Sequence, residues 1–281
     1  MKAGSDQERV DRLMDEAFEA LDMSKPKVAL RIAKALKRMR YSGHFEVQAL
    51  AYANLGKLPK AIQVLREGTD KCPDVGQLWQ LLGNYLSDED RLEEAFEAYE
   101  KALCADESYV ESLNLNYAIA LIRSGKTTQA RKRIGPIIEA PNFQELKGSI
   151  RARMLAIELQ ALRLLDDCDA AVACFEDIAD QKFGDDAGEE LSILWTEYAR
   201  SLLKVGRRND AENAINQSVR FNAQNEEALW LLRDIRRKAT DAETRHYNIM
   251  VKGDWYDSSS GENDTAISFL TTYVVCADNE A

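Results

Sequence analysis

The stretch LWQLLGNYLSDEDRLEEAFEAYEKAL, residues 78–103, decides the fold because it holds two apolar stripes separated by a polar break. The first stripe recurs at steps of three and four residues, which places its members on one face of a helix: Trp79, Leu82, Gly83 and Leu86. The segment 87–90, SDED, interrupts the pattern with residues typical of turns and helix caps. The second stripe has the same periodicity: Leu92, Ala95, Tyr99, Ala102 and Leu103. The stretch therefore predicts two short helices joined by a tight turn.

The same helical hairpin recurs along the chain. Ala61, Ala95 and Ala130 occupy equivalent positions, 34 and 35 residues apart. Two further units, at 162–179 and 202–215, repeat the pattern with wider spacings of 41 and 40 residues, which indicates longer helices or loops. One hairpin cannot bury its own apolar stripe, whereas stacked hairpins share a continuous core.

These residues resemble the tetratricopeptide repeat family. Residues 76–109 follow its order of bulky residue, Leu and Gly in the first helix, then Ala, aromatic and Ala in the second. The resemblance extends over residues 8–242, closely at 42–75, 110–144 and 192–225, and in degenerate form at 8–41 and 145–186. It implies an all-α fold, a right-handed superhelical solenoid of antiparallel helix pairs. Residues 1–242 would form about six pairs and a terminal helix.

Composition excludes several classes of protein. The net charge of −11 and the isoelectric point of about 4.9 argue against general binding to phosphate backbones, so no nucleic-acid partner is expected. No apolar run is long enough to span a membrane. The five cysteines are odd in number and scattered. Cys72, Cys104 and Cys174 fall within or beside helical stripes and are interpreted as buried thiols of a cytoplasmic protein.

The sequence gives little support for catalysis. Its two histidines, His44 and His246, lie in no metal-ligand spacing, and no glycine-rich phosphate loop is present. The acidic clusters fall in turns or at helix starts, where capping explains them. We therefore expect no enzymatic activity, no cofactor and no metal site.

The resemblance implies that the first helices line an inner groove in which partners bind. Nine residues are candidates for contacting a partner there: Asn84, Leu115, Ile119, Arg123, Arg153, Arg163, Arg200, Lys204 and Trp230.

The candidate groove becomes basic from Arg123 onward, against the acidic charge of the whole chain. Arginine can hold a carboxylate through two parallel hydrogen bonds, so an acidic peptide or a C-terminal carboxylate is the expected ligand. The alternative is that these cations pair with neighbouring acids such as Glu197 or Glu158, which would leave no free site.

Residues 243–281 have a different pattern. HYNIMVKGDW (246–255) alternates apolar and polar residues, and 265–278 is rich in β-branched and aromatic residues, so each segment predicts a strand. The strands would form a small C-terminal β-hairpin unit, which is marginal in water by itself. It would pack on the end of the solenoid, pair with another chain or belong to a larger domain, and exposed strand edges could form a homodimer.

The function expected from these features is a non-catalytic scaffold for protein–protein interaction. One alternative is a regulatory module whose C-terminal β unit is the effector or the oligomerisation element. Another alternative is an RNA-binding helical repeat. The acidic charge of the chain and the lack of aromatic residues on the inner face, apart from Trp230, argue against it.

Overall fold

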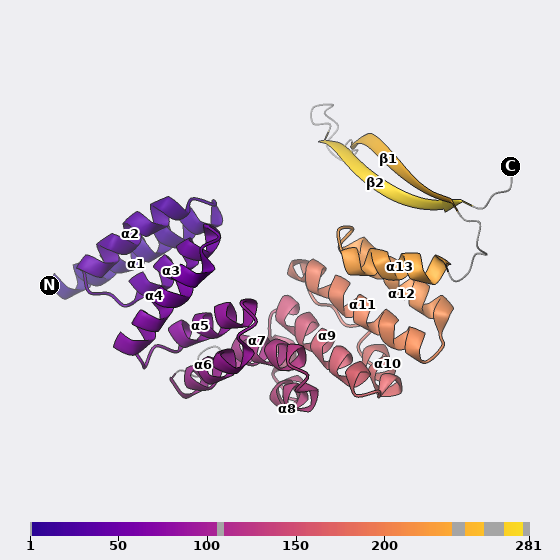
Figure 1. Ribbon diagram of the computed structural model, residues 1–281, viewed down its shortest axis with the longest axis horizontal. Helices are drawn as coiled ribbons and strands as arrows, with labels where there is room; N and C mark the ends of the chain where they lie inside the picture. The colour runs from indigo at the N-terminus through magenta and orange to yellow at the C-terminus, as the bar shows by residue number, and fades with distance from the viewer. Residues whose placement is uncertain (1, 106–109, 238–244, 256–266, 278–281) are drawn as a thin grey trace.

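A computed structural model describes residues 2–105, 110–237, 245–255 and 267–277 (Figure 1). The described part contains thirteen α-helices, of which twelve form six consecutive pairs. The first helices of the pairs are α1 (Lys2–Asp22), α3 (Gly43–Asn54), α5 (Gly76–Asp88), α7 (Val110–Arg123), α9 (Gly148–Leu164) and α11 (Gly188–Lys204). The second helices are α2 (Pro26–Arg38), α4 (Leu58–Lys71), α6 (Leu92–Ala105), α8 (Thr127–Ile138), α10 (Cys168–Glu176) and α12 (Arg208–Phe221). Helix α13 (Glu226–Arg237) follows the last pair.

The helices form an arch (Figure 1). Each first helix packs against the second helix of its own pair and also contacts the first helix of the next pair. Helices α5, α7, α9 and α11 lie along the inner side of the arch, whereas α6, α8 and α10 lie on the outer side. The all-helical solenoid predicted from the repeats is thus confirmed over the described helices.

One turn geometry is repeated in all six pairs. A residue in the left-handed region ends each first helix: Ser24, Gly56, Asp90, Gly125, Asp166 and Gly206. The backbone N–H of the residue after it donates to a carbonyl five residues earlier, as from Lys57 to Tyr52 and from Arg91 to Leu86, both at an N···O distance of 2.8–2.9 Å. This hydrogen bond satisfies a carbonyl that the helix end leaves free.

The wide spacings of the later repeats come from both longer helices and longer connections. Helices α9 and α11 each have 17 residues, compared with 12 to 14 in α3, α5 and α7. The connections into them are also extended and contain the 3₁₀ helices η1 (Phe143–Glu145) and η2 (Asp185–Ala187). The alternation of first and second helices is preserved despite these insertions.

The small residue in the first helix of the repeat at 76–109 makes room for an aromatic ring from the second helix. A Cβ atom on Gly83 would lie 2.6 Å from Cε1 of Tyr99, whose side chain is fully buried. Trp79 is only half-buried, and its Nε1 donates to the carbonyl of Pro73 at 2.8 Å. The pairing of a large with a small residue therefore involves Tyr99 and Gly83, while Trp79 packs at the edge of the core.

Two strands follow the helices. β1 (Arg245–Trp255) and β2 (Ile267–Ala277) pair antiparallel, with Arg245 opposite Ala277 and Trp255 opposite Ile267. They coincide with the two predicted strand segments. Residues 256–266, which would connect them, and the expected domain boundary at 242/243 lie outside the described residues. The β-hairpin unit is therefore not established as a whole, and its role in dimerisation stays a prediction.

Candidate partner-binding groove

The inner side of the arch is formed by the first helices, and the nine candidate residues lie on α5, α7, α9, α11 and α13. The arrangement confirms that successive first helices are neighbours. Some of the nine residues form hydrogen bonds or ion pairs with neighbouring helices, whereas others form none with any described residue.

Arg123 at the end of α7 is bound to the end of α5. Its guanidinium donates to the carbonyl oxygen of Ser87 at 2.8 Å and to the Ser87 hydroxyl at 3.1 Å. It also forms an ion pair of 3.3 Å with Asp90, whose side chain is largely exposed. These contacts join two consecutive repeats, so Arg123 is only partly available to a partner.

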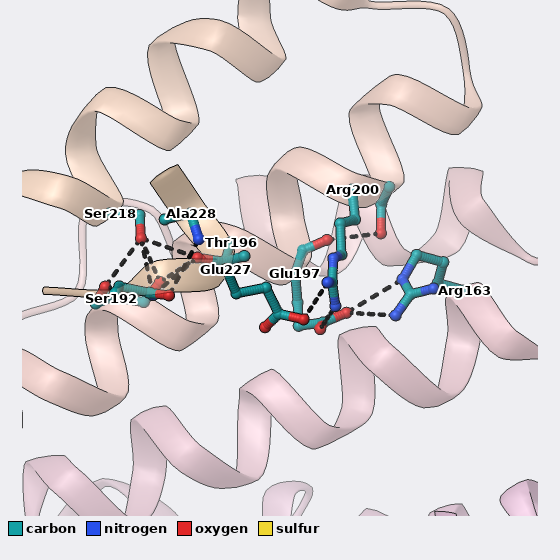
Figure 2. Close-up of polar contacts among 10 residues, drawn as sticks. Arg163, Ser192, Thr196, Glu197, Arg200, Ser218, Glu227 and Ala228 are labelled. Carbon is teal, nitrogen blue, oxygen red and sulfur yellow. Dashed lines mark hydrogen bonds and ion pairs between the residues drawn. The ribbon is translucent and has the colours of Figure 1, made fainter. Parts of the chain in front are cut away.

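Arg163 and Arg200 share one buried carboxylate (Figure 2). Arg163 donates to Oε2 of Glu197 through Nε at 3.1 Å and through a terminal nitrogen at 2.9 Å, and Arg200 donates to Oε1 at 2.8 Å. Arg200 also pairs with Glu227 on α13. The side chain of Glu197 is only 5% exposed, so the arginines neutralise a charge that could not otherwise be buried. Pairing with Glu197, one of the two alternatives left open by the sequence, is what the structure shows.

Glu158, the other acid considered, pairs with Arg131 on α8 at 2.6 Å. Arg131 lies on a second helix and is not one of the nine candidates. The free cations among the nine are Arg153 and Lys204, because neither has a hydrogen-bond or ion-pair partner among the described residues. Arg153 is half-buried on α9, and Lys204 is exposed at the end of α11.

Trp230 on α13 is the most exposed large apolar side chain in the described part, at 63%. The guanidinium of Arg233 lies 4.9 Å from the centre of its ring. An indole face with an adjacent cation offers both an apolar surface and a charge to an incoming partner.

The three remaining candidates are mainly structural. The Asn84 amide oxygen accepts a hydrogen bond of 3.0 Å from the Tyr99 hydroxyl. Leu115 is buried, and Ile119 is half-buried against the core. They form the floor of the inner side near α5 and α7.

A buried polar cluster beneath the inner side was missed by the sequence interpretation (Figure 2). The hydroxyl group of Ser218 on α12 lies 2.9 Å from that of Ser192 and 2.8 Å from that of Thr196, both on α11. All three residues are 0% exposed. Asn225 donates to the Ser192 hydroxyl at 2.8 Å and accepts from the backbone N–H of Ala228 at 3.1 Å. The cluster therefore fixes the start of α13, which carries Trp230. Small hydroxyl residues at scattered spacings gave no signal for it.

The described residues provide no group of three or more His, Cys, Asp or Glu arranged to hold a metal ion. The cysteine interpretation was partly wrong, since Cys104 is exposed, while Cys168 is buried and Cys72 and Cys174 are half-buried. No helix among the described residues is long and apolar enough to cross a membrane.

Comparison with known proteins supports the repeat assignment. Residues 76–109 match the family model of the tetratricopeptide repeat. No curated protein matches the chain. The chain thus contains a tetratricopeptide repeat at residues 76–109, within a solenoid of helix pairs that resembles solved structures of such repeats.

Solved structures share the fold at low sequence identity. PilW, described as a widely conserved type IV pilus biogenesis factor, is 18% identical with a TM-score of 0.61 over 79% of this chain and 98% of that chain. BtubC from P. vanneervenii is 18% identical with a TM-score of 0.54, covering 76% and 91%. A chain of the APC/C hetero-tetramer Cut9–Hcn1 is 11% identical with a TM-score of 0.60, covering 79% and 42%. This chain thus spans less than half of that last chain, and the likeness concerns the fold alone.

Proposed function

We propose that the protein is a non-catalytic scaffold that recruits a protein or peptide through the inner side of its first helices. The observation that carries this proposal is that two cations on these helices, Arg153 and Lys204, have no hydrogen-bond or ion-pair partner among the described residues, whereas Arg163 and Arg200 on the same helices are paired. The network of Arg163, Arg200 and Glu197 shapes the surface, and the unpaired cations remain free to bind a ligand.

The ligand that fits this surface is an acidic segment of a partner protein. One carboxylate of such a segment can accept two hydrogen bonds from the guanidinium of Arg153, and a second carboxylate can accept one from Lys204 near the other end of α11. Each charge-assisted hydrogen bond contributes about 1.5–3 kcal/mol, so a few of them with an apolar contact on Trp230 correspond to a Kd of roughly micromolar order. The hetero-tetrameric assembly of the Cut9–Hcn1 structure supports an assembly role for this fold.

Affinity capture from a native lysate with the full chain tests the proposal. Arg153→Glu with Lys204→Glu should remove the captured partner, because the two free cations become acids. The matched control is Lys60→Glu with Lys132→Glu, which makes the same charge change at exposed positions of α4 and α8. Equal capture by both double variants would contradict the groove as the recruiting site.

A Trp230→Ala variant measures the contribution of the apolar contact to partner binding separately from that of the charges. Trp230 is largely exposed, so its removal should leave the fold intact while weakening capture by about tenfold. Nuclease treatment of the lysate before capture examines the RNA-binding alternative, since a partner bridged by RNA would then be lost.

A further inference from the structure

Two adjoining cavities lie between α10, α11 and α12, away from the inner side of the arch. The first has a volume of about 380 Å³ and is lined mainly by apolar residues: Phe175, Ile178, Leu191, Leu194, Trp195 and Phe221. The second, of about 290 Å³, shares Phe175, Ala179 and Trp195 with the first. None of the nine groove candidates lines either cavity.

The cavities result from the shortness of α10. This helix has 9 residues, whereas the other second helices have 12 to 14. The chain leaves the helix after Glu176, so a last turn that would cover the following first helix is missing. Trp195 is consequently half-buried and Phe221 is 44% exposed.

The outer wall of the first cavity is held in place by α9. The Arg151 guanidinium donates to the carbonyl of Lys182 at 2.9 Å and lies 5.0 Å from the ring centre of Phe183. Gly148 lets the backbone of Phe183 approach closely, since a Cβ there would lie 1.3 Å from the Phe183 carbonyl oxygen. The wall is therefore organised before any ligand arrives, which lowers the entropic cost of binding.

The inner wall is an aromatic cluster. Phe175 stacks on Tyr198 with a centroid distance of 3.9 Å and packs against Trp195 in a T-shaped arrangement with a centroid distance of 4.6 Å. Rings packed in this way leave no slot for a planar molecule to insert between them. They offer instead a fixed apolar surface against which a bulky side chain can pack.

The charges around the second cavity disfavour an ionic ligand. Arg207 donates to Glu176 and to Asp210, both at 2.7 Å. Because these two carboxylates already balance the charge of its guanidinium, Arg207 does not favour binding of an anion. The amide side chains of Asn213 and Gln217 also line this cavity, one helical turn apart on α12, and no described residue bonds to them. The polar groups that remain available in the second cavity are therefore neutral amides, while Lys182 and Asp185, of opposite charge, both line the first.

We propose that this pair of cavities is a second binding site, which takes a neutral peptide segment anchored by one bulky apolar side chain. The side chain occupies the first cavity against Phe175 and Trp195. The adjoining peptide groups exchange hydrogen bonds with Asn213 and Gln217 in the second cavity. This site is independent of the inner groove.

Titration of the full chain with N-acetyl-phenylalanine amide tests this proposal. The probe carries one apolar side chain and two peptide groups, and a molecule of its size in a fitting site binds with a Kd of about a millimolar. The readout is the NMR signal of the Trp195 indole N–H, assigned with a Trp195→Phe variant. We expect a saturable shift of this signal, and binding should be at least about tenfold weaker for N-acetyl-glycine amide and for phenylacetate.

Two variants keep the test specific. Ala179→Leu fills the wall common to both cavities and should weaken binding at least about tenfold, whereas Ala173→Leu, at another exposed alanine of the same segment, should not change it. Asn213→Ala with Gln217→Ala should weaken binding of the amide probe by about fivefold. The absence of a saturable shift, equal binding by the two leucine variants, or phenylacetate binding as tightly as the amide would each overturn the proposal. Since none of these changes touches Arg153 or Lys204, failure here leaves the proposed groove function untouched.

Discussion

The repeat at 76–109 and the longer repeats between 145 and 225 build the same pair of helices by different means. In the first, a glycine in one helix receives the Tyr99 ring from the other, and the contact is apolar. In the later repeats, the inserted connection before α11 is held by hydrogen bonds, such as those from Arg151 to the carbonyl of Lys182 and from Ser149 to Asp186, and the helices themselves share the buried polar groups of Glu197 and Ser218. One close backbone contact, between Gly148 and Phe183, completes them.

This difference indicates that regularly spaced helices are positioned mainly by the shapes of their apolar side chains, while the longer repeats depend more on directional contacts. Apolar packing tolerates small adjustments, because neighbouring side chains can move. Buried hydrogen bonds do not, because a group that loses its partner remains desolvated. The later repeats should therefore be more sensitive to single polar substitutions than the earlier ones.

The largest effect is expected at Gly148. Alanine there would place Cβ 1.3 Å from a backbone oxygen, so the segment around Phe183 must move, at a cost of about 3 kcal/mol or more in the free energy of unfolding. Urea unfolding followed by circular dichroism measures this loss. Gly135→Ala is the control: apart from its chain neighbours and its own helix backbone, nothing lies within 4 Å of its Cβ position in α8, and it should cost less than about 1 kcal/mol, mainly through crowding against Pro136. Similar stabilities of the two variants would show that the contact with Phe183 is unimportant.

Glu197→Gln should have the next largest effect. The substitution leaves Arg163 and Arg200 without their shared charge, and their side chains are only 16% and 27% exposed. We expect a loss of about 2–3 kcal/mol in the free energy of unfolding, somewhat below that of a fully buried pair. Glu94→Gln, at an exposed pair with Arg66, should cost less than about 1 kcal/mol. Equal losses would mean that burial of the Glu197 network does not matter.

Gly83→Ala examines the apolar side of the comparison. The new Cβ would meet the Tyr99 ring at 2.6 Å, and we expect a loss of about 1–3 kcal/mol. In a double-mutant cycle with Tyr99→Leu, the smaller side chain should relieve part of that loss. Strictly additive effects of the two substitutions would contradict the proposed interlock of glycine and ring.

Ser218→Ala should cost about 1–2 kcal/mol, because the hydroxyl groups of Ser192 and Thr196 lose a buried partner. The triple variant Ser192→Ala, Thr196→Val and Ser218→Ala removes all three hydroxyl groups. Its loss should be smaller than the sum of the three single losses, since fewer unpaired groups then remain buried. Thermal unfolding of the four variants measures both quantities, and an additive triple variant would argue against a connected cluster.

The smallest effect concerns pH. Burial lowers the pKa of the His44 imidazole below its ordinary value of 6.5, outweighing the opposing effect of the hydrogen bond to the Tyr41 carbonyl; Lys37 and Lys71 lower it further and Glu67 raises it. The folded state therefore favours neutral His44, and the associated stability is present above pH 6.5 and is lost as the pH falls through the lowered pKa. The melting temperature should fall more steeply below pH 6.5 for the natural chain than for His44→Asn. Parallel curves would show that His44 does not contribute.

The fold was largely predictable because periodicity determines which residues face the core. Small and aromatic residues at Gly83, Ala95 and Tyr99 indicate that two helices approach closely. The regular spacing of Ala61, Ala95 and Ala130 indicates that the helix pair repeats. The left-handed turns at Asp90 and Asp166 were less evident, because these positions carry no glycine. Their geometry follows from the hydrogen bonds that end the preceding helix.

The candidate groove was predictable only in outline. Periodicity places Arg163, Arg200 and Arg153 on the inner side, but it does not say which of them finds an acid. Arg163 meets Glu197 because their helices are adjacent and the carboxylate lies between two guanidinium groups. The cavities beside Trp195 depend on where α10 ends, which the degenerate sequence at 145–186 did not reveal.

Photo-crosslinking tests most directly the claim that partners bind on the inner side. A benzoylphenylalanine residue would replace Gln160, which lies two helical turns from Arg153 on the same face of α9, and, as outer controls, Lys132 on α8 and Ala173 on α10. The groove account predicts a crosslinked partner from position 160 in native lysate, lost when Arg153→Glu and Lys204→Glu are added. A crosslinked partner from positions 132 or 173 alone would contradict it.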